Sequence, residues 1–252
     1  VEFNLLVTSV ADNFFVGGKD AKVDEFPYMV SLRQTDDYYL CGGSILNAHT
    51  ILTAAHCVEQ KLFSPYIFQT ADGVMVIVGS IYRNTGGTKY LISKITIHPD
   101  YGTPNGLSND IAMLTTSEPI TTSEPITTSS SVGFIALPTS TTAAGVNVTL
   151  TGWGLTSVST GESPNTLQKI TLLTISDEDC NKTSTISVDD TNTCTFTKVG
   201  QGACNGDSGG PLADGKVLVG IVSAGKPCAE GYPDVYTRVS SYIPWIKNNI
   251  HS

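Results

Sequence analysis

The chain has 252 residues, 40% of them hydrophobic and 15% charged, so it can bury one large β domain or two small ones and is neither disordered nor fibrous. The net charge is −9, so the chain lacks the excess of basic residues that binds a phosphate backbone, and no nucleic acid partner is expected. No run approaches about 18 consecutive apolar residues and no basic amphipathic face occurs, so no membrane partner is expected either.

The N-terminal segment is not expected to belong to the fold. Residues 3–11 form an apolar run that ends in a small residue, as at the end of a signal peptide. A short propeptide or an expression remnant is the other interpretation. Residues 1–14 are therefore set apart from a single domain over 15–252.

From Phe15 onward the chain is expected to form mostly β-strands. Short apolar or alternating runs are broken by Gly, Pro, Asn and Asp, which is typical of an all-β barrel or sandwich. A tandem Ser-Glu-Pro-Ile-Thr-Thr at residues 117–128 predicts a linker between two halves. The expected strand runs are 28–33, 43–53, 74–78, 91–97 and 146–151.

Two short helices are expected. Ser176 and Asp179 match a capping box, which predicts a helix over 176–182. Near the C-terminus, Ser241 is the expected N-cap and Pro244 fits the first turn. The apolar stripe of this second helix consists of Val239, Tyr242, Ile243, Ile246 and Ile250.

The six cysteines are free thiols, metal ligands or three disulfides. No Cys-x-x-Cys and no Cys/His cluster with zinc spacing occurs, so disulfides and an oxidising, extracellular compartment are favoured. Two Asn-x-Ser/Thr triplets, at Asn147 and Asn181, suit that compartment as glycosylation sites. Spacing alone cannot choose among the fifteen pairings that six cysteines allow.

Three segments carry residue types that could perform chemistry. His56 lies in Thr-Ala-Ala-His-Cys, Asp110 precedes an apolar run, and Ser208 lies in Gly-Asp-Ser-Gly-Gly-Pro. Singly, each is explained as a core histidine, a turn residue or a loop serine. Together they supply a nucleophile, a base and an orienting carboxylate, which a serine needs because its hydroxyl is a weak nucleophile at neutral pH.

These three motifs, in this order, resemble those of the chymotrypsin/trypsin family of serine endopeptidases. The resemblance runs from Phe15 to the C-terminal helix and includes Cys-Gly-Gly-Ser at 41–44 and Gly-Trp-Gly at 152–154. It implies an all-β fold of two antiparallel six-stranded barrels with the active site between them. The implied limits are 28–116 for barrel 1, 117–131 for the linker, 132–238 for barrel 2 and 240–250 for the helix.

The resemblance also implies the role of each residue. Ser208 is the nucleophile, His56 the general base and Asp110 the carboxylate that orients the imidazole. The backbone N–H groups of Gly206 and Ser208 form the oxyanion hole. The implied disulfides are Cys41–Cys57, Cys180–Cys194 and Cys204–Cys228.

The implied substrate pocket has Gly202 at its floor, where trypsin-like enzymes carry Asp, and a wall of Ser223 and Gly225. Asp234 is at a position where most members of the family have Gly. Gly at the floor with Asp at this position resembles collagenolytic crustacean proteases and some insect chymotrypsins. The resemblance implies a preference for cleavage after large apolar residues, with some tolerance for basic ones. If Asp234 is paired or points away, a plain chymotrypsin-like pocket remains. Ala224 replaces the aromatic residue usual in the family. The contacts of this wall with the substrate backbone and with the substrate residue before the scissile one are therefore expected to be weaker or wider.

The start of the domain departs from the family, because Phe14-Phe15 replaces the basic residue and the Ile or Val of the activation site. Cleavage between them would free an α-amine on Phe15 to pair with Asp207. The alternative is a non-catalytic homologue that acts as a binding protein.

The sequence thus predicts a secreted, monomeric endopeptidase with protein or peptide substrates and protein inhibitors as partners. No metal or cofactor is expected, since residues 70–90 lack the Glu residues of the family's calcium loop.

Overall fold

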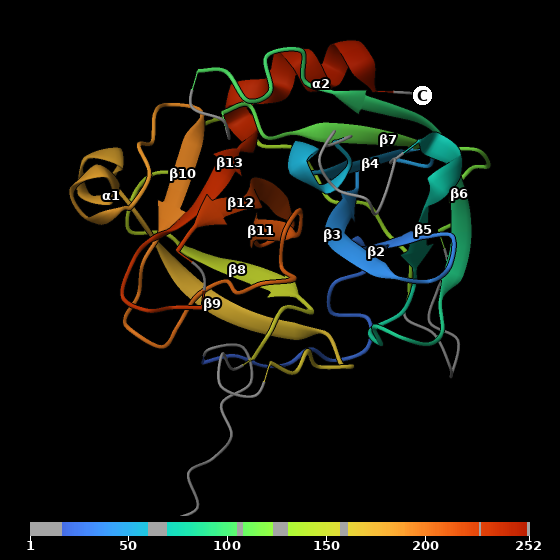
Figure 1. The fold of residues 1–252 in the computed structure, drawn as a ribbon, viewed down its shortest axis with the longest axis horizontal. Helices are drawn as coiled ribbons and strands as arrows, with labels where there is room; N and C mark the ends of the chain where they lie inside the picture. The colour runs from blue at the N-terminus through green and yellow to red at the C-terminus, as the bar shows by residue number, and fades with distance from the viewer. Residues whose placement is uncertain are drawn as a thin grey trace, which may run out of the picture.

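The computed structural model describes residues 17–59, 70–104, 108–122, 131–156, 161–226 and 228–250. Within these ranges the strands form two closed six-stranded antiparallel barrels side by side (Figure 1), as predicted. The first barrel consists of β2 (Met29–Gln34), β3 (Tyr39–Ile45), β4 (Thr50–Thr53), β5 (Val74–Val78), β6 (Thr88–Ile97) and β7 (Ala112–Thr116). The second consists of β8 (Asn147–Gly152), β9 (Gln168–Ile175), β10 (Asn192–Thr195), β11 (Pro211–Asp214), β12 (Val217–Gly225) and β13 (Asp234–Arg238).

Hydrophobic patterning explains where the strands form. Strand β5 is an unbroken apolar run and is buried along its whole length. Strand β9 alternates buried and more exposed residues, as expected where one face packs on the barrel interior. The short β1 (Lys19–Asp20) extends the second barrel by pairing with β9. The apolar run at 43–53, read as one segment, is instead the end of β3, a turn and β4.

The first helix, α1 (Asp177–Thr183), begins where the capping box predicts. The Ser176 Oγ accepts from the Asp179 N–H at 3.0 Å, and three acidic residues occupy the first turn.

The second helix, α2 (Ile243–Asn249), starts later than expected. A 3₁₀ turn over Val239–Tyr242 precedes it, so Tyr242 is at the N-cap position and the prediction of Ser241 as N-cap is wrong. The Ser241 hydroxyl donates to the Asp190 carbonyl at 2.8 Å instead. Pro244 lies in the first turn, as predicted.

The C-terminal segment crosses from the second barrel to the first. In Figure 1, α2 lies beside β7, and Val239, Tyr242 and Ile246 join the apolar core of the first barrel. The centroid of the His98 ring lies 5.3 Å from that of the Tyr242 ring and 5.2 Å from that of the Trp245 ring. This packing holds the two barrels together.

The linker is described in part. Ile120, in the first hexapeptide copy, is 2% exposed, and its N–H donates to the Ala48 carbonyl at 2.6 Å. The second copy and the segment over 1–14 lie outside the described residues. Among the described helices, none has the length and apolarity required to cross a membrane.

Three disulfides join Cys41 to Cys57, Cys180 to Cys194 and Cys204 to Cys228, the pairings that the resemblance implied. The first fixes the segment that follows β4 against β3. The third ties the loop before β11 to the loop before β13. Both therefore restrain segments that meet at the junction of the barrels.

Candidate active site

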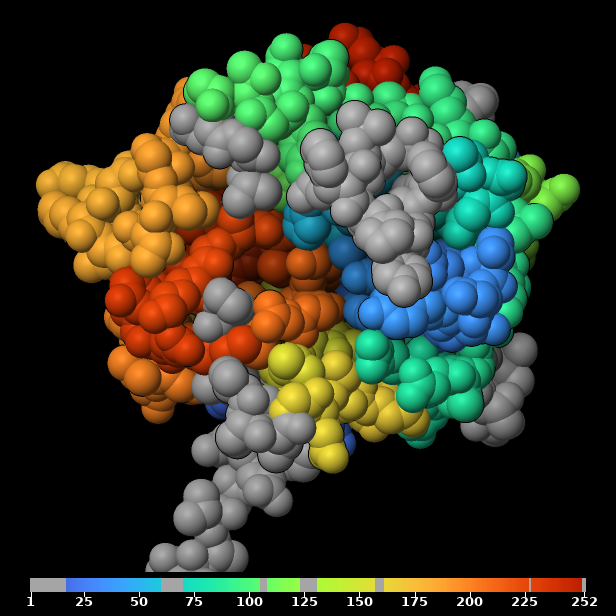
Figure 2. Space-filling view, in the orientation of Figure 1, coloured from blue at the N-terminus to red at the C-terminus, as the bar shows by residue number. Residues whose placement is uncertain are grey.

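A hollow lies between the barrels on the face shown in Figure 2, bordered by second-barrel residues in orange and red and first-barrel residues in blue. Ser208 lines a cavity of about 260 Å³. The other lining residues are Ala203, Cys204, Asn205, Val222, Ser223, Ala224, Gly225, Lys226 and Asp234.

His56 and Asp110 form a close pair, and Asp110 also contacts Ser223, which lines this cavity. The His56 Nδ1 lies 2.7 Å from the Asp110 Oδ2, and the His56 backbone N–H donates to the Asp110 Oδ1 at 2.9 Å. The imidazole is 20% exposed, whereas the carboxylate is 1% exposed. Two contacts to one carboxylate fix the orientation of the ring, so Nε2, which lies 3.8 Å from the Cys57 Sγ, is the nitrogen available for proton transfer.

The second barrel also holds Asp110 in place. The Ser223 hydroxyl on β12 donates to the Asp110 Oδ2 at 2.6 Å, and the Thr237 hydroxyl on β13 donates to the Asp110 carbonyl at 2.7 Å. The buried carboxylate therefore has hydrogen-bond donors from both barrels, as a buried charge requires. The sequence placed Ser223 only in the pocket wall and gave no signal for Thr237.

Ser208 lies in a turn that packs on the first barrel. Its carbonyl accepts from the Gly42 N–H at 2.8 Å. Gly209 has a φ of +72°, and a methyl group there would lie 2.7 Å from the Gly42 carbonyl and 3.0 Å from the Cys57 Sγ. Only glycine fits this approach, which brings the serine turn against the segment that carries His56.

Gly206 has the left-handed backbone that glycine adopts most readily, with a φ of +98°. Its carbonyl accepts from the Tyr39 hydroxyl at 2.9 Å, a contact that the sequence did not reveal. The Asn205 carbonyl accepts from the Leu155 N–H at 2.8 Å. The two peptide groups on either side of Gly206 are thus each held by a hydrogen bond.

Asp207, between Gly206 and Ser208, is fully buried. Its carboxylate accepts from the backbone N–H groups of Gly154 and Cys204 at 2.8 and 2.9 Å. Burial raises the pKa of this carboxyl to about 7, although the two donors act in the opposite direction. Phe15, the predicted source of its cationic partner, lies outside the described residues.

Asp234 faces the cavity that Ser208 lines. A methyl group at Gly202 would lie 2.5 Å from the Asp234 Oδ2, so the carboxyl covers the position expected for the pocket floor. It accepts from the Ala203 N–H at 2.9 Å and is 7% exposed. Burial raises its pKa to about 7. At the same cavity, the Lys226 ammonium lies 2.8 Å from the Glu230 carboxylate.

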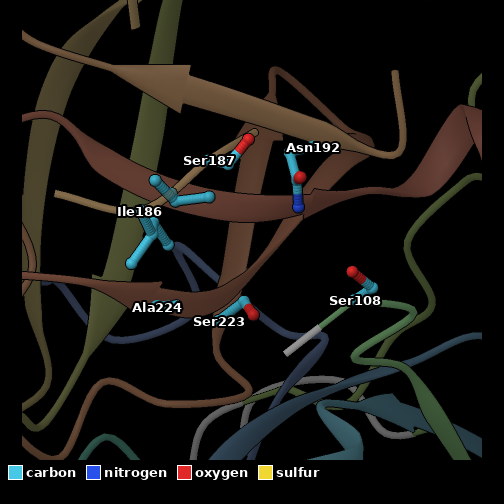
Figure 3. A pocket seen from close by; sticks show the side chains of 7 residues that line it. Ser108, Ile186, Ser187, Asn192, Ser223 and Ala224 are labelled. Atoms are coloured by element: carbon cyan, nitrogen blue, oxygen red, sulfur yellow. The ribbon is translucent and has the colours of Figure 1, made fainter. Parts of the chain in front are cut away.

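A second cavity, of about 340 Å³, shares Ser223 and Ala224 as lining residues with the first. Figure 3 shows the Asn192 and Ser108 side chains directed toward the space above Ser223, with Ser187 next to Asn192 and Ile186 on the side away from Ser108. The methyl side chain of Ala224 leaves this space open, in line with the wider contacts expected from the sequence.

One group of His and Cys atoms in the described residues, at Cys41, His56 and Cys57, is compact enough to hold a metal ion. Both sulfurs are joined in a disulfide, so neither offers a thiolate.

The structure brings the predicted residues together in two groups. His56 and Asp110 are in contact, and Ser208, Ser223, Gly225 and Asp234 line one cavity. Gly202, Gly206 and Asp207 lie in the loop beside it.

Comparison with known proteins identifies the family of the chain. The Trypsin family model matches residues 15–246. The chain belongs to the trypsin family. The chain is similar to chymotrypsin-2 of Vespa crabro, with 41% identity over 93% of this chain and 99% of the relative. Trypsin-1 of Astacus astacus is 37% identical over 93% and 99%, and brachyurin of Leptuca pugilator is 36% identical over 92% and 96%.

Membership of the trypsin family makes the protein a serine endopeptidase that acts on peptide bonds. Its relatives thus include an invertebrate chymotrypsin, an invertebrate trypsin and a brachyurin.

Proposed function

We propose that the protein is a secreted endopeptidase that works through an acyl-enzyme formed on Ser208. The observation that carries this proposal is the His56–Asp110 pair at 2.7 Å beside the cavity that Ser208 lines. The three disulfides support an oxidising compartment.

In the proposed reaction, the Ser208 Oγ attacks the scissile carbonyl carbon while the His56 Nε2 takes the hydroxyl proton. The carbonyl oxygen becomes an oxyanion, which the N–H groups of Gly206 and Ser208 stabilise. His56 then gives its proton to the leaving amine as the C–N bond breaks. A water molecule attacks the resulting ester in the same way and releases Ser208.

The test is incubation of the secreted protein with a serine-directed organophosphonate, followed by intact-mass measurement and peptide turnover. We expect one adduct on Ser208, loss of turnover in proportion to labelling, and a labelled species that starts at Phe15. An unlabelled chain that starts at Phe15 and does not turn over peptides would contradict the proposal and favour a non-catalytic homologue.

We also propose that an α-ammonium on Phe15 is the partner of Asp207. A fully buried carboxyl with a raised pKa gains from a cation, since ionisation in a buried site is otherwise costly. The position of Gly17 supports this role. A methyl group on Gly17 would lie 2.8 Å from the Gly200 carbonyl, so the start of the domain packs against the segment that leads to Asp207. The same mass spectrum tests it: a labelled chain that retains residues 1–14 would contradict it.

For the pocket we propose a preference for large apolar side chains with tolerance for basic ones that increases with pH. The pKa of Asp234 is about 7, so its carboxyl is neutral at lower pH and anionic at higher pH. Only the anion attracts an Arg or Lys side chain strongly.

The ratio of cleavage after Arg or Lys to cleavage after Phe or Tyr is therefore expected to increase from pH 6 to pH 8.5. The measurement is kcat/KM for matched peptides that differ at this residue only. In Asp234→Asn, whose amide oxygen can still accept from the Ala203 N–H, the ratio is expected to be low and independent of pH. A wild-type ratio that does not change with pH would rule out this role for Asp234.

A further inference from the structure

The hydroxyl of Tyr39 makes a contact between the two barrels that the mechanism above does not use. It donates to the Gly206 carbonyl at 2.9 Å, across 167 positions of sequence. Tyr39 is the first residue of β3 in the first barrel, whereas Gly206 lies in the loop before β11 in the second. The bond therefore connects the first barrel to the loop that leads to Ser208.

The Tyr39 ring is held on two sides. The Trp153 ring meets it edge to face, with centroids 6.2 Å apart and an angle of 74°. The Arg83 guanidinium lies 4.6 Å from the ring centroid. Both contacts are attractive, and together they give the hydroxyl one direction in which to donate.

The hydrogen bond acts on a backbone that glycine leaves free to rotate. The C=O and N–H of a planar trans peptide point in opposite directions, so a bond to one sets the direction of the other. The Asn205 carbonyl is held by the Leu155 N–H, which sets the direction of the Gly206 N–H. Tyr39 holds the Gly206 carbonyl, whose peptide group also carries the Asp207 N–H, the donor to the Cys204 carbonyl at 3.1 Å. The peptide groups before and after Gly206 are therefore both fixed, and with them the backbone conformation of Gly206.

Strand β3 also sets the position of the other reacting groups. Cys41 is bonded to Cys57, which follows His56, and the Gly42 N–H donates to the Ser208 carbonyl at 2.8 Å. Tyr39, Cys41 and Gly42 thus hold the oxyanion loop, the base and the nucleophile from one rigid strand.

We propose that Tyr39 is a positioning residue: its hydroxyl holds the Gly206 carbonyl and so keeps Gly206 in the backbone conformation in which the Gly206 N–H faces the oxyanion as it forms. This role rests on the proposed function. It predicts an effect on the transition state and not on substrate binding, because the negative charge on the carbonyl oxygen develops only during the reaction.

The test uses Tyr39→Phe, which keeps the ring and its contacts with Arg83 and Trp153 and removes only the donor. We expect kcat to decrease about tenfold, the equivalent of one hydrogen bond, while KM changes by less than roughly twofold. Affinity for a peptide boronic acid, which forms a tetrahedral adduct, is expected to decrease by the same factor. Affinity for the hydrolysed product peptide is expected to stay at the wild-type value.

The matched control is Tyr38→Phe, which removes the hydroxyl of the neighbouring tyrosine, 63% exposed, and is expected to change none of these values. Wild-type kcat and boronic-acid affinity in Tyr39→Phe would overturn the positioning role and leave the proposed function standing. Equal loss of affinity for the boronic acid and the product would overturn it as well, since that indicates general loosening. A wild-type protein that neither turns over peptides nor binds the boronic acid would overturn the proposed function and, with it, this role.

Discussion

Replacing Ser208 by Ala is expected to lower kcat for peptide hydrolysis by about 10⁶-fold. The alanine has no oxygen to form the ester, so turnover is left to water activated in the same site. Residual catalysis of about 10³-fold over the reaction in water is expected from the oxyanion hole and substrate binding. The measurement is kcat and KM with a chromogenic peptide, with active sites of the wild type titrated by organophosphonate.

The fold is expected to survive this change, because Ser208 contributes its backbone carbonyl to the packing against Gly42. The unfolding midpoint of Ser208→Ala is therefore expected to match that of the wild type. Ser187→Ala is the matched control, since Ser187 lines the neighbouring cavity and is expected to retain full turnover. Turnover by Ser208→Ala within a hundredfold of the wild type would refute the role of Ser208.

The second large effect is expected from Asp110→Asn, which should lower kcat/KM by about 10⁴-fold at neutral pH. In the wild type, the Oδ1 accepts from the His56 backbone N–H and the Oδ2 faces the His56 Nδ1. The asparagine oxygen is expected to keep the backbone contact, which turns the amide N–H₂ toward Nδ1. Nδ1 must then accept a hydrogen bond from this amide, so the neutral imidazole carries its proton on Nε2 and cannot act as base.

Ser223→Ala is the control that separates this effect from a general loss of hydrogen bonding. It removes the 2.6 Å bond to the Asp110 Oδ2 and leaves the carboxylate with its two contacts to His56. We expect a loss of kcat/KM of no more than about tenfold, the equivalent of one hydrogen bond. An Asp110→Asn variant as active as Ser223→Ala would contradict the role assigned to the carboxylate.

Local sequence was sufficient for several elements. The capping box at Ser176 is a contact between residues close in sequence. The unbroken apolar run of β5 and the stripe of Val239, Tyr242 and Ile246 make distant contacts, but each is an apolar pattern within one short segment and can be read directly. The N-cap at Ser241 failed because the preceding 3₁₀ turn, set by packing of the chain end on the first barrel, displaced the helix start.

The sequence also indicated the residue types of the site, because each lies in a short motif. The glycines of these motifs allow tight turns and close contacts, and the cysteines form disulfides. The sequence could not show the partners of the site residues. Thr237 and Ser223 reach Asp110 across 127 and 113 positions, and Tyr39 reaches Gly206 across 167. No local sequence pattern indicates a hydrogen bond between residues so far apart in the chain.

By itself, then, the sequence determined the β-rich fold class and the serine, histidine and aspartate that the proposed mechanism uses. Tertiary structure alone decided that the Asp234 carboxyl covers Gly202 in the cavity of Ser208, that Ser223 contacts Asp110, and that β3 holds both the His56 segment and the Gly206 loop. The physical reason is that closure of each barrel and packing of one on the other fix these distances, which depend on every strand between the two contacting residues.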